Sequence, residues 1–142
     1  MDAWRSFLRA HARLLRVLET ELVAEHPINL GAYDVLVQLA EAPERRLRMA
    51  ELADAVLLSR SGVTRLVDRL EQAGMVTRQR FDGDGRGKVA IITTKGIDTL
   101  RAAARTHLTG VVTHFINHMT PAELTEIGEL CTRLTTQVST QR

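Results

Sequence analysis

Apolar residues recur at helical spacing through most of the chain, and caps and prolines between them mark where helices begin and end. Over residues 3–24 the apolar positions fall on one side of a helix, with arginines on the other, and Pro27 stops the pattern. Asn29 is a favourable cap for a second helix, which ends near Pro43. A short third helix is predicted over residues 50–56.

The fourth predicted helix is followed by a change of period. Ser59 is suited to cap this helix, whose apolar residues share one stripe, and Gly74 stands where a helix commonly ends in a left-handed residue. Residues 75–81 and 88–92 then alternate as two short strands around the glycine-rich turn DGDGRG. The segment therefore predicts a helix followed by a β-hairpin.

Two further helices are predicted after the hairpin. Thr93 can cap a long helix from about residue 94 to residue 119. The segment TPAE at 120–123 supplies a cap, a first-turn proline and a capping-box glutamate for a final helix that ends near Val138. No linker or repeat interrupts this series of elements.

This order of elements predicts a mainly α (α+β) fold. Three central helices followed by a hairpin form the winged version of the helix-turn-helix, whose last helix enters the major groove of DNA. We predict a single domain over residues 1–142, with the winged lobe at 29–93 and long dimerisation helices at 1–28 and 94–142. The apolar stripes of the long helices need a cover, because isolated helices are marginal in water. Packing against the same helices of a second copy would cover them, so a homodimer is expected.

The central segment, of about fifty residues, reads LRMAELADAVLLSRSGVTRLVDRLEQAGMVTRQRFDGDGRGKVAIITTKG. Its LA helix, its S-x-S-x-V-T-R-L-V-D-R-L-E-x-x-G helix and its D-x-R-G wing resemble the DNA-binding lobe of the MarR family. The resemblance implies a transcription regulator, most simply a repressor, that binds a pseudo-palindromic operator as a dimer and is often released by a small ligand. Ala50 departs from the serine or threonine cap that is usual there, which is expected to weaken the third helix slightly.

The charge of the chain is informative through its arrangement and not through its total. The formal net charge is only +2, but residues 43–88 contain ten Arg or Lys and seven Asp or Glu. The segment that resembles the DNA-binding lobe is therefore the basic part of the chain. With 44% hydrophobic and 25% charged residues, the chain has the composition of a folded globular protein.

Polar and basic residues share the outward face of the fourth helix. At about 100° per residue, Ser61, Thr64, Arg65 and Asp68 lie opposite the apolar stripe. Hydroxyl groups near a helix N-terminus reach bases or phosphates, and arginine makes bidentate contacts with guanine. A charged helix face is usually just solvated, and the helix-turn-helix context is what favours DNA contact here. The predicted DNA-binding residues are Ser59, Arg60, Ser61, Thr64, Arg65, Arg69, Arg86 and Lys88.

Two acidic residues are predicted to support this surface and its wing. Asp68 would be repelled by phosphates, so we assign it to orienting Arg65 or an arginine of the wing. Asp84 resembles the family's turn-stabilising acid, and Arg86 between glycines is placed to enter the minor groove. A plain polar hairpin tip is the alternative. A phosphate-binding loop is excluded, because Val89 stands where that motif needs serine or threonine.

Three histidines share one face of the predicted helix at 94–119. His114 and His118 have the i, i+4 spacing of a metal-ligand pair, and His107 lies about two turns before His114. No cysteine or evident carboxylate completes a ligand set, so a polar edge of the dimer is favoured over metal binding, and no cofactor is expected. The single cysteine, Cys131, is interpreted as a buried, inert thiol.

The resemblance also implies where a small effector binds. The family's cleft lies between the dimerising helices and the DNA-binding lobe, which brings the first helix near Tyr33. Trp4 and His11 lie on the apolar stripe of that helix, and an aromatic ring with an imidazole, near Arg5 or Arg9, would suit a flat aromatic acid. Burial in a core is the alternative for both residues, and the commoner fate of residues on an apolar stripe.

Three classes of function are compared on these residues. A sequence-specific regulator of double-stranded DNA is favoured, and a DNA-architectural or antirepressor protein with the same fold and no defined operator is the alternative. An enzyme is not expected, because no nucleophile–base pair, paired catalytic carboxylates or cofactor loop is recognisable. No apolar run approaches the roughly 18 residues of a membrane span, so no membrane contact and a cytoplasmic location are expected.

Overall fold

The computed structural model describes residues 1–57, 62–81 and 87–139. Helices make up most of these residues, and a small sheet accompanies them, as the sequence predicts. The elements in chain order are α1 (Asp2–Glu25), α2 (Leu30–Glu41), the 3-10 helix η1 (Pro43–Arg45), β1 (Arg46–Arg48), α3 (Met49–Ala55), α4 (Val63–Gln72), β2 (Val76–Arg80), β3 (Lys88–Ile92), α5 (Thr94–His114), the 3-10 helix η3 (Ile116–His118) and α6 (Pro121–Ser139).

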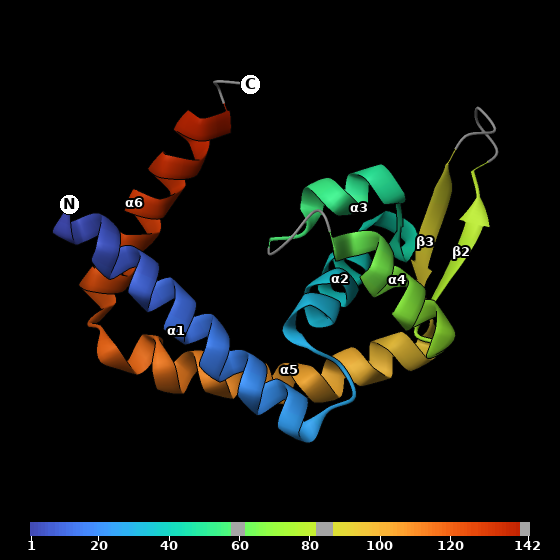
Figure 1. Cartoon of the computed structure of the whole chain (residues 1–142), viewed down its shortest axis with the longest axis horizontal. Coiled ribbons are helices and arrows are strands. Elements are labelled where there is room, and N and C mark those ends of the chain that lie inside the picture. Colours follow the sequence, from blue (N-terminus) through green and yellow to red (C-terminus); the bar gives the residue numbers. More distant parts are fainter. Residues whose placement is uncertain (58–61, 82–86, 140–142) are drawn as a thin grey trace.

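Helices α2, α3 and α4 and the sheet form a lobe, which packs on the long helices α1 and α5 (Figure 1). Helices α2, α3 and α4 gather with the sheet on one side of the molecule, and α5 runs beneath them from the strands toward α6. Helix α1 packs along α5, and α6 rises from the far end of α5, on the side away from the strands. This is the predicted winged helix-turn-helix with long N- and C-terminal helices, and the fold class is confirmed.

The sheet has three antiparallel strands in the order β1-β3-β2. Strand β2 pairs with β3 from Val76 opposite Ile92 to Arg80 opposite Lys88, which is the predicted hairpin. Strand β1 pairs with the other edge of β3, with Arg46 opposite Ile91. The sequence analysis missed β1, because three residues are too short to show an alternating pattern.

The hydrophobic core is continuous between the lobe and the long helices. Leu36 of α2, Leu52 of α3 and Val67 of α4 are completely buried, and Leu22 of α1 and Ala103 of α5 belong to the same cluster. Burial of each large aliphatic side chain stabilises the fold by roughly 1.5–3 kcal/mol. The lobe is therefore packed onto α1 and α5, whereas none of the described side chains at positions 121–138 of α6 is buried.

Three of the predicted helix caps, at Asn29, Thr93 and Thr120, are present. The Asn29 side chain accepts a hydrogen bond from the Ala32 N–H (2.8 Å), and Thr93 accepts one from the Gly96 N–H (3.1 Å). At the start of α6, Glu123 Oε2 accepts from the Thr120 N–H (2.8 Å), as a capping box requires. These local hydrogen bonds explain why the sequence placed the starts of three helices correctly.

Two helix boundaries differ from the prediction. Helix α5 ends at His114, five residues before the expected residue 119, and Phe115 leaves helical geometry with φ −123° and ψ −62°. The following 3-10 helix η3 leads into the Thr120 cap of α6. Helix α3 begins at Met49, so its N-cap residue is Arg48 and not Ala50, and the Glu51 carboxylate accepts from the Arg48 N–H (3.1 Å). Ala50 therefore lies inside the first turn of α3, and the lack of a serine or threonine there removes no cap.

The start of α4 is described only in part. The helix is described from Val63, with Gly62 at its N-cap position. Ser59, the predicted cap, lies outside the described residues. At the other end, Gly74 has φ +77°, which is the left-handed conformation that the sequence analysis expected. No helix among the described residues is long and apolar enough to cross a membrane.

The junction between the hairpin and α5 generates a prediction about stability. A Cβ atom added to Gly96 would lie 2.2 Å from the Met75 carbonyl oxygen, which already accepts the Thr93 N–H at 3.0 Å. Because backbone cannot give way easily, we expect Gly96→Ala to lower the free energy of unfolding by roughly 1–3 kcal/mol in urea titrations. Gly128→Ala is the matched control, since no atom lies within 4 Å of its added Cβ, and it should leave stability equal or higher. Equal stability of the two variants would contradict the close approach.

Candidate nucleic-acid interface

Helix α4 is held to the lobe by one face and exposes the other. Val63, Val67 and Leu70 are buried against the core, at 3% exposure or less. Thr64 and Arg65 are exposed on the outward side of the same two turns. The helix is therefore rigidly supported and presents a hydroxyl group and a guanidinium group to solvent, as the sequence predicts for a helix that reads a major groove.

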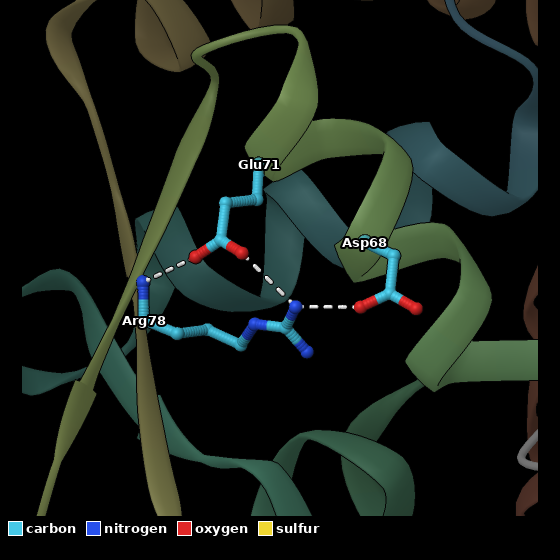
Figure 2. Close-up of polar contacts among 3 residues, drawn as sticks. All are labelled: Asp68, Glu71 and Arg78. Atoms are coloured by element: carbon cyan, nitrogen blue, oxygen red, sulfur yellow. Dashed lines mark hydrogen bonds and ion pairs between the residues drawn. The ribbon is translucent and has the colours of Figure 1, made fainter.

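The side of α4 that faces the wing carries an ion-pair network (Figure 2). Nη2 of Arg78, in β2, donates to Oδ1 of Asp68 (2.5 Å) and to Oε1 of Glu71 (3.0 Å), and the Arg78 N–H donates to Oε2 of Glu71 (3.0 Å). The Arg78 side chain is only 16% exposed. One residue of the strand thus bonds two successive turns of the helix through both its side chain and its backbone.

This network identifies the partner of Asp68. The sequence analysis assigned Asp68 to Arg65 or to an arginine of the wing, and the partner is Arg78 of the wing strand β2. Within residues 1–57, 62–81 and 87–139, Arg65 has no ion pair or hydrogen bond from its side chain. Arg78 therefore offsets part of the acidic charge on α4, and the Arg65 side chain is exposed.

Sequence reasoning missed Arg78 as a functional residue. The signal was in the strand pattern, because Arg78 is separated by one residue from the buried Val76 and lies opposite the buried Ala90 of β3. Alternation then directs its side chain to the same face of the sheet as those two core residues, where α4 packs. An arginine on the core face needs acidic partners, and Asp68 with Glu71 supplies them.

The strength of this network is reflected in the pKa values of its members. The hydrogen bond from the Arg78 side chain lowers the pKa of Glu71 below its ordinary value of 4.5. The hydrogen bonds to Glu71 and then to Asp68 raise the pKa of Arg78. Charge-assisted hydrogen bonds of this kind are stronger than neutral ones, so the network fixes the wing relative to the helix.

Arg69 lies on a different side of α4 from this network. It lines a shallow hollow of about 150 Å³ with Pro27, Asn29 and Met75, and its side chain is exposed. This position faces the connection between α1 and α2, and not the wing. Arg69 therefore remains a candidate for DNA contact at the flank of the helix, separate from Arg65.

On the wing, two exposed basic residues oppose each other. Arg80 and Lys88 are register partners in the β2–β3 pair and both are exposed, so they carry positive charge on the same face of the sheet as Arg78. Arg80 was not among the predicted DNA-binding residues. The predicted residues Ser59, Arg60, Ser61, Asp84 and Arg86 lie outside the described residues.

An aromatic contact lies at the end of the β2–β3 hairpin next to Phe81 and Gly87. The guanidinium carbon of Arg48, in β1, lies 3.7 Å from the centre of the Phe81 ring. The Phe81 N–H donates to the carbonyl oxygen of Gly87 at 3.3 Å, which closes the hairpin at its described end. This cation–π contact joins β1 to the residue that follows β2.

The three predicted effector residues do not line one cavity. Tyr33 lines a cleft of about 360 Å³ between α1, α2 and α5, where its ring lies 4.6 Å from that of His107. His11 lines a separate hollow of about 200 Å³ against the end of α5. Trp4 lines neither and is 56% exposed, stacked beside Phe7 at 6.2 Å. In this chain neither Trp4 nor His11 is buried in a core.

Two of the three histidines of the metal hypothesis have different partners, His107 with Tyr33 and His114 with Glu21. Because α5 ends at His114, His118 falls in η3 and the expected helical pairing of the two is lost. His114 Nε2 lies 2.6 Å from Oε1 of Glu21, a carboxylate neighbour from α1 that the sequence could not show. No group of three potential metal ligands occurs in the part of the chain that is described. Cys131 is half-buried in α6.

Comparison with known proteins agrees with this geometry. A family model described as the MarR family matches residues 26–87. The structure of AbsC, a MarR family transcriptional regulator from Streptomyces coelicolor, is similar with a TM-score of 0.87 and 32% identity over 96% of this chain and 92% of AbsC. Sco3205, a MarR family transcriptional regulator from the same organism solved in complex with DNA, has a TM-score of 0.88 and 35% identity over 94% of this chain and 83% of that chain.

Comparison of sequences alone identifies a further relative. The HTH-type transcriptional regulator PapX from Escherichia coli is 28% identical over 116 residues, which is 82% of this chain. The matched part is 61% of PapX, so the chain spans less than two thirds of the length of that relative.

The ion-pair network makes stability depend on pH in a defined direction. A carboxyl group whose pKa is lowered by folding stabilises the protein above its unfolded-state pKa, and this contribution is lost as the pH falls through the folded-state value. Arg78→Gln removes the partner of Glu71, so we expect the variant to be less stable than the parent at neutral pH. The difference should shrink as the pH falls below about 4.5.

Chemical denaturation of both proteins across this pH range measures the effect. Arg80→Gln, the same substitution at an exposed position two residues along β2, is the control and should change stability little at any pH. A destabilisation by Arg78→Gln that is the same at acidic and neutral pH would contradict an ionic role for the network.

Proposed function

We propose, since the chain belongs to the MarR family of transcription regulators, that it binds a defined operator in double-stranded DNA and represses transcription there. The observation that carries this proposal is the outward face of α4. Thr64 and Arg65 are exposed on a helix whose acidic side chains are paired with Arg78 of the wing. The positive charge of Arg78 offsets part of the carboxylate charge that would otherwise repel phosphates.

The proposed contacts divide between the two grooves. Thr64 and Arg65 of α4 read base edges in the major groove, where an arginine forms two hydrogen bonds with guanine. Arg69, Arg80 and Lys88 are placed around that helix and on the wing, and contact phosphates. The proposal keeps Ser59, Arg60 and Ser61 as further contacts of the helix-turn-helix, and Arg86, next to Asp84, as the minor-groove contact of the wing.

The protein is proposed to act as a homodimer. Large apolar side chains remain exposed on the long helices, and those on α1 and α6 are Trp4, Phe7, Leu8, Val23, Leu130, Leu134 and Val138. An exposed apolar surface of this extent is unfavourable in water, and the same helices of a second copy would cover it. Two copies related by a twofold axis would place two α4 helices in successive major grooves, about 34 Å apart, on a pseudo-palindromic site.

Release by a small ligand is the last part of the proposal. The cleft beside Tyr33 lies where the lobe meets α1 and α5, so an occupant would contact both the DNA-reading lobe and the helices that carry it. A ligand that reverses the population from DNA-competent to incompetent must favour the second state by about 5.5 kcal/mol. Such selectivity is within reach of a ligand buried in a cleft of this size.

The proposal predicts a specific loss on substitution of Arg65. Arg65→Ala should weaken operator binding by about 1–3 kcal/mol per half-site and relax the preference at one base pair, because a contact with a base edge is removed. Selection of bound fragments from random DNA gives the operator, and titration of parent and variant then gives the affinities. Arg101→Ala, which removes an exposed arginine from α5, is the control.

Two results would contradict this role. Unchanged affinity and base preference in Arg65→Ala would exclude a base contact from this residue. A parent protein that binds all fragments equally would favour the DNA-architectural alternative over a regulator with an operator.

The proposed dimer predicts the effect of a charge on α6. Leu134 is 56% exposed in the single chain, so Leu134→Glu leaves the chain's own core intact but would place a carboxylate in the apolar interface. We expect the variant to sediment as a folded monomer with weakened operator binding. Thr136→Glu, on the opposite side of the same helix, should remain dimeric. A parent protein that sediments as a monomer would reject the dimer.

A further inference from the structure

The three-stranded sheet has an outer face, on the side opposite to α4. Arg48 of β1 lies opposite Val89 of β3, which in turn lies opposite Gln79 of β2, so the three side chains share this outer face. Arg80 and Lys88 form the next register pair and therefore lie on the other face of the sheet. Because Arg48, Arg80 and Lys88 are all exposed, both faces of the sheet carry positive charge.

The Arg48 side chain crosses the outer face toward Phe81. Its guanidinium carbon lies 3.7 Å from the centre of the Phe81 ring, which follows β2. Strand β3 lies between β1 and β2, so the side chain passes over β3, where Val89 is the register partner of Arg48. Val89 is only 7% exposed although it belongs to the outer face, and the crossing side chain is placed to cover it.

Both ends of the Arg48 side chain are held in place. Arg48 occupies the N-cap position of α3, and its main-chain N–H donates to Oε2 of Glu51 at 3.1 Å. At the other end, the contact with the Phe81 ring uses the face of the guanidinium group and leaves its N–H donors, which lie in the plane of the group, for other partners. An exposed guanidinium that is positioned in this way loses less conformational freedom on binding an anion than a freely moving arginine does.

We propose that Arg48, positioned by Phe81, contacts a DNA phosphate on the strand that runs along the outer face of the wing. The inference rests on the proposed function, in which α4 enters a major groove and the hairpin lies at the adjacent minor groove. Two phosphate strands border a minor groove, so an element that enters it has one strand along each of its faces. Arg80 and Lys88 meet the strand on the side of α4, and Arg48 meets the strand on the opposite border. A guanidinium group suits this role because it can form two parallel hydrogen bonds with one phosphate.

The salt dependence of DNA binding tests this contact. Each phosphate that a protein neutralises adds about 0.9 to the slope of log affinity against log salt concentration. Arg48→Met keeps an unbranched side chain over Val89 and beside the Phe81 ring but removes the charge. This variant should lower the magnitude of the slope by about one per half-site and weaken binding roughly tenfold per half-site. Base preference should stay that of the parent, because phosphate contacts do not read sequence directly.

Fluorescence titration of a labelled duplex at several NaCl concentrations gives the slopes, and circular dichroism checks that each variant is folded. Arg101→Met, which removes an exposed arginine from α5, is the matched control and should keep the affinity and slope of the parent. A loss of affinity in Arg48→Met with an unchanged slope would show a purely structural role and overturn the proposal. Parental affinity and slope in Arg48→Met would overturn it as well.

Phe81→Leu separates the charge of Arg48 from its positioning. The variant keeps the guanidinium group but removes the aromatic ring on which it lies. Binding should weaken several-fold, because Arg48 must then be ordered when DNA binds, and the salt slope should remain that of the parent. Parental affinity in Phe81→Leu would overturn the positioning role of the ring.

Neutral phosphates in the DNA locate the contact. A methylphosphonate has a methyl group in place of one charged phosphate oxygen, so a series of duplexes with single replacements removes one charge at a time. At one position the replacement should weaken binding of the parent but not of Arg48→Met, because the variant has already lost that contact. Arg80→Met should show the same behaviour at a position on the opposite strand of the same minor groove. Coupling of both arginines to one strand would overturn the assignment of Arg48 to the outer border.

The outcomes separate this inference from the proposed function. The sequence preference of the parent protein tests the function, and the salt slope of Arg48→Met tests the inference. A parent that selects an operator, together with a parental slope in Arg48→Met, would overturn the inference alone. A parent that binds all duplexes equally would overturn the proposed operator, and slopes measured on any duplex would still decide the role of Arg48. A parent that binds no duplex would overturn both.

Discussion

The double attachment of Arg78 to α4 is the interaction on which the DNA-facing surface depends. A two-stranded hairpin is marginally stable by itself, and its angle to a neighbouring helix is not set by backbone hydrogen bonds within the sheet. Arg78 sets that angle by bonding Asp68 and Glu71, one turn apart on the helix. The single positive charge of Arg78 also offsets part of the negative charge of these two carboxylates. Arg78 thus adds a direct bond between the wing strand and α4 to the packing of Val76 and Ala90 in the core.

The lobe that carries this surface is joined to the long helices by short, well-bonded connections. The Lys95 ammonium group donates to the Ala73 carbonyl oxygen at 2.7 Å, so the start of α5 is tied to the end of α4. On the other side, Oε2 of Glu19 in α1 accepts from the Leu30 N–H at 2.6 Å, which ties α1 to the first turn of α2. With Leu22 and Ala103 in the shared core, these bonds make the lobe follow any movement of α1 and α5.

What the sequence could predict was the part of the structure that local interactions determine. Asn29, Thr93 and Thr120 act through hydrogen bonds within three or four residues, so their helix starts were placed correctly. The hairpin followed from alternation, and the resemblance of the central segment identified the fold. The strand β1 is too short for periodicity to detect, and its pairing with β3 depends on residues more than forty positions away.

The residues of the candidate site were predictable to the same extent. Those that the sequence analysis missed depend on tertiary contacts, as β1 does. The outward face of α4 follows from helical geometry alone, so Thr64 and Arg65 were found. Arg78, Glu21 and Arg48 act through partners on other elements, and their roles require the tertiary arrangement. Trp4 and His11 share the apolar stripe of α1 and Tyr33 belongs to α2, yet the fold places the three in different surroundings. Arg78 bonds β2 to α4, and a shared core joins the lobe to α1 and α5. Control of DNA binding would then act where the lobe meets α1 and α5, by changing the position of the lobe as a whole.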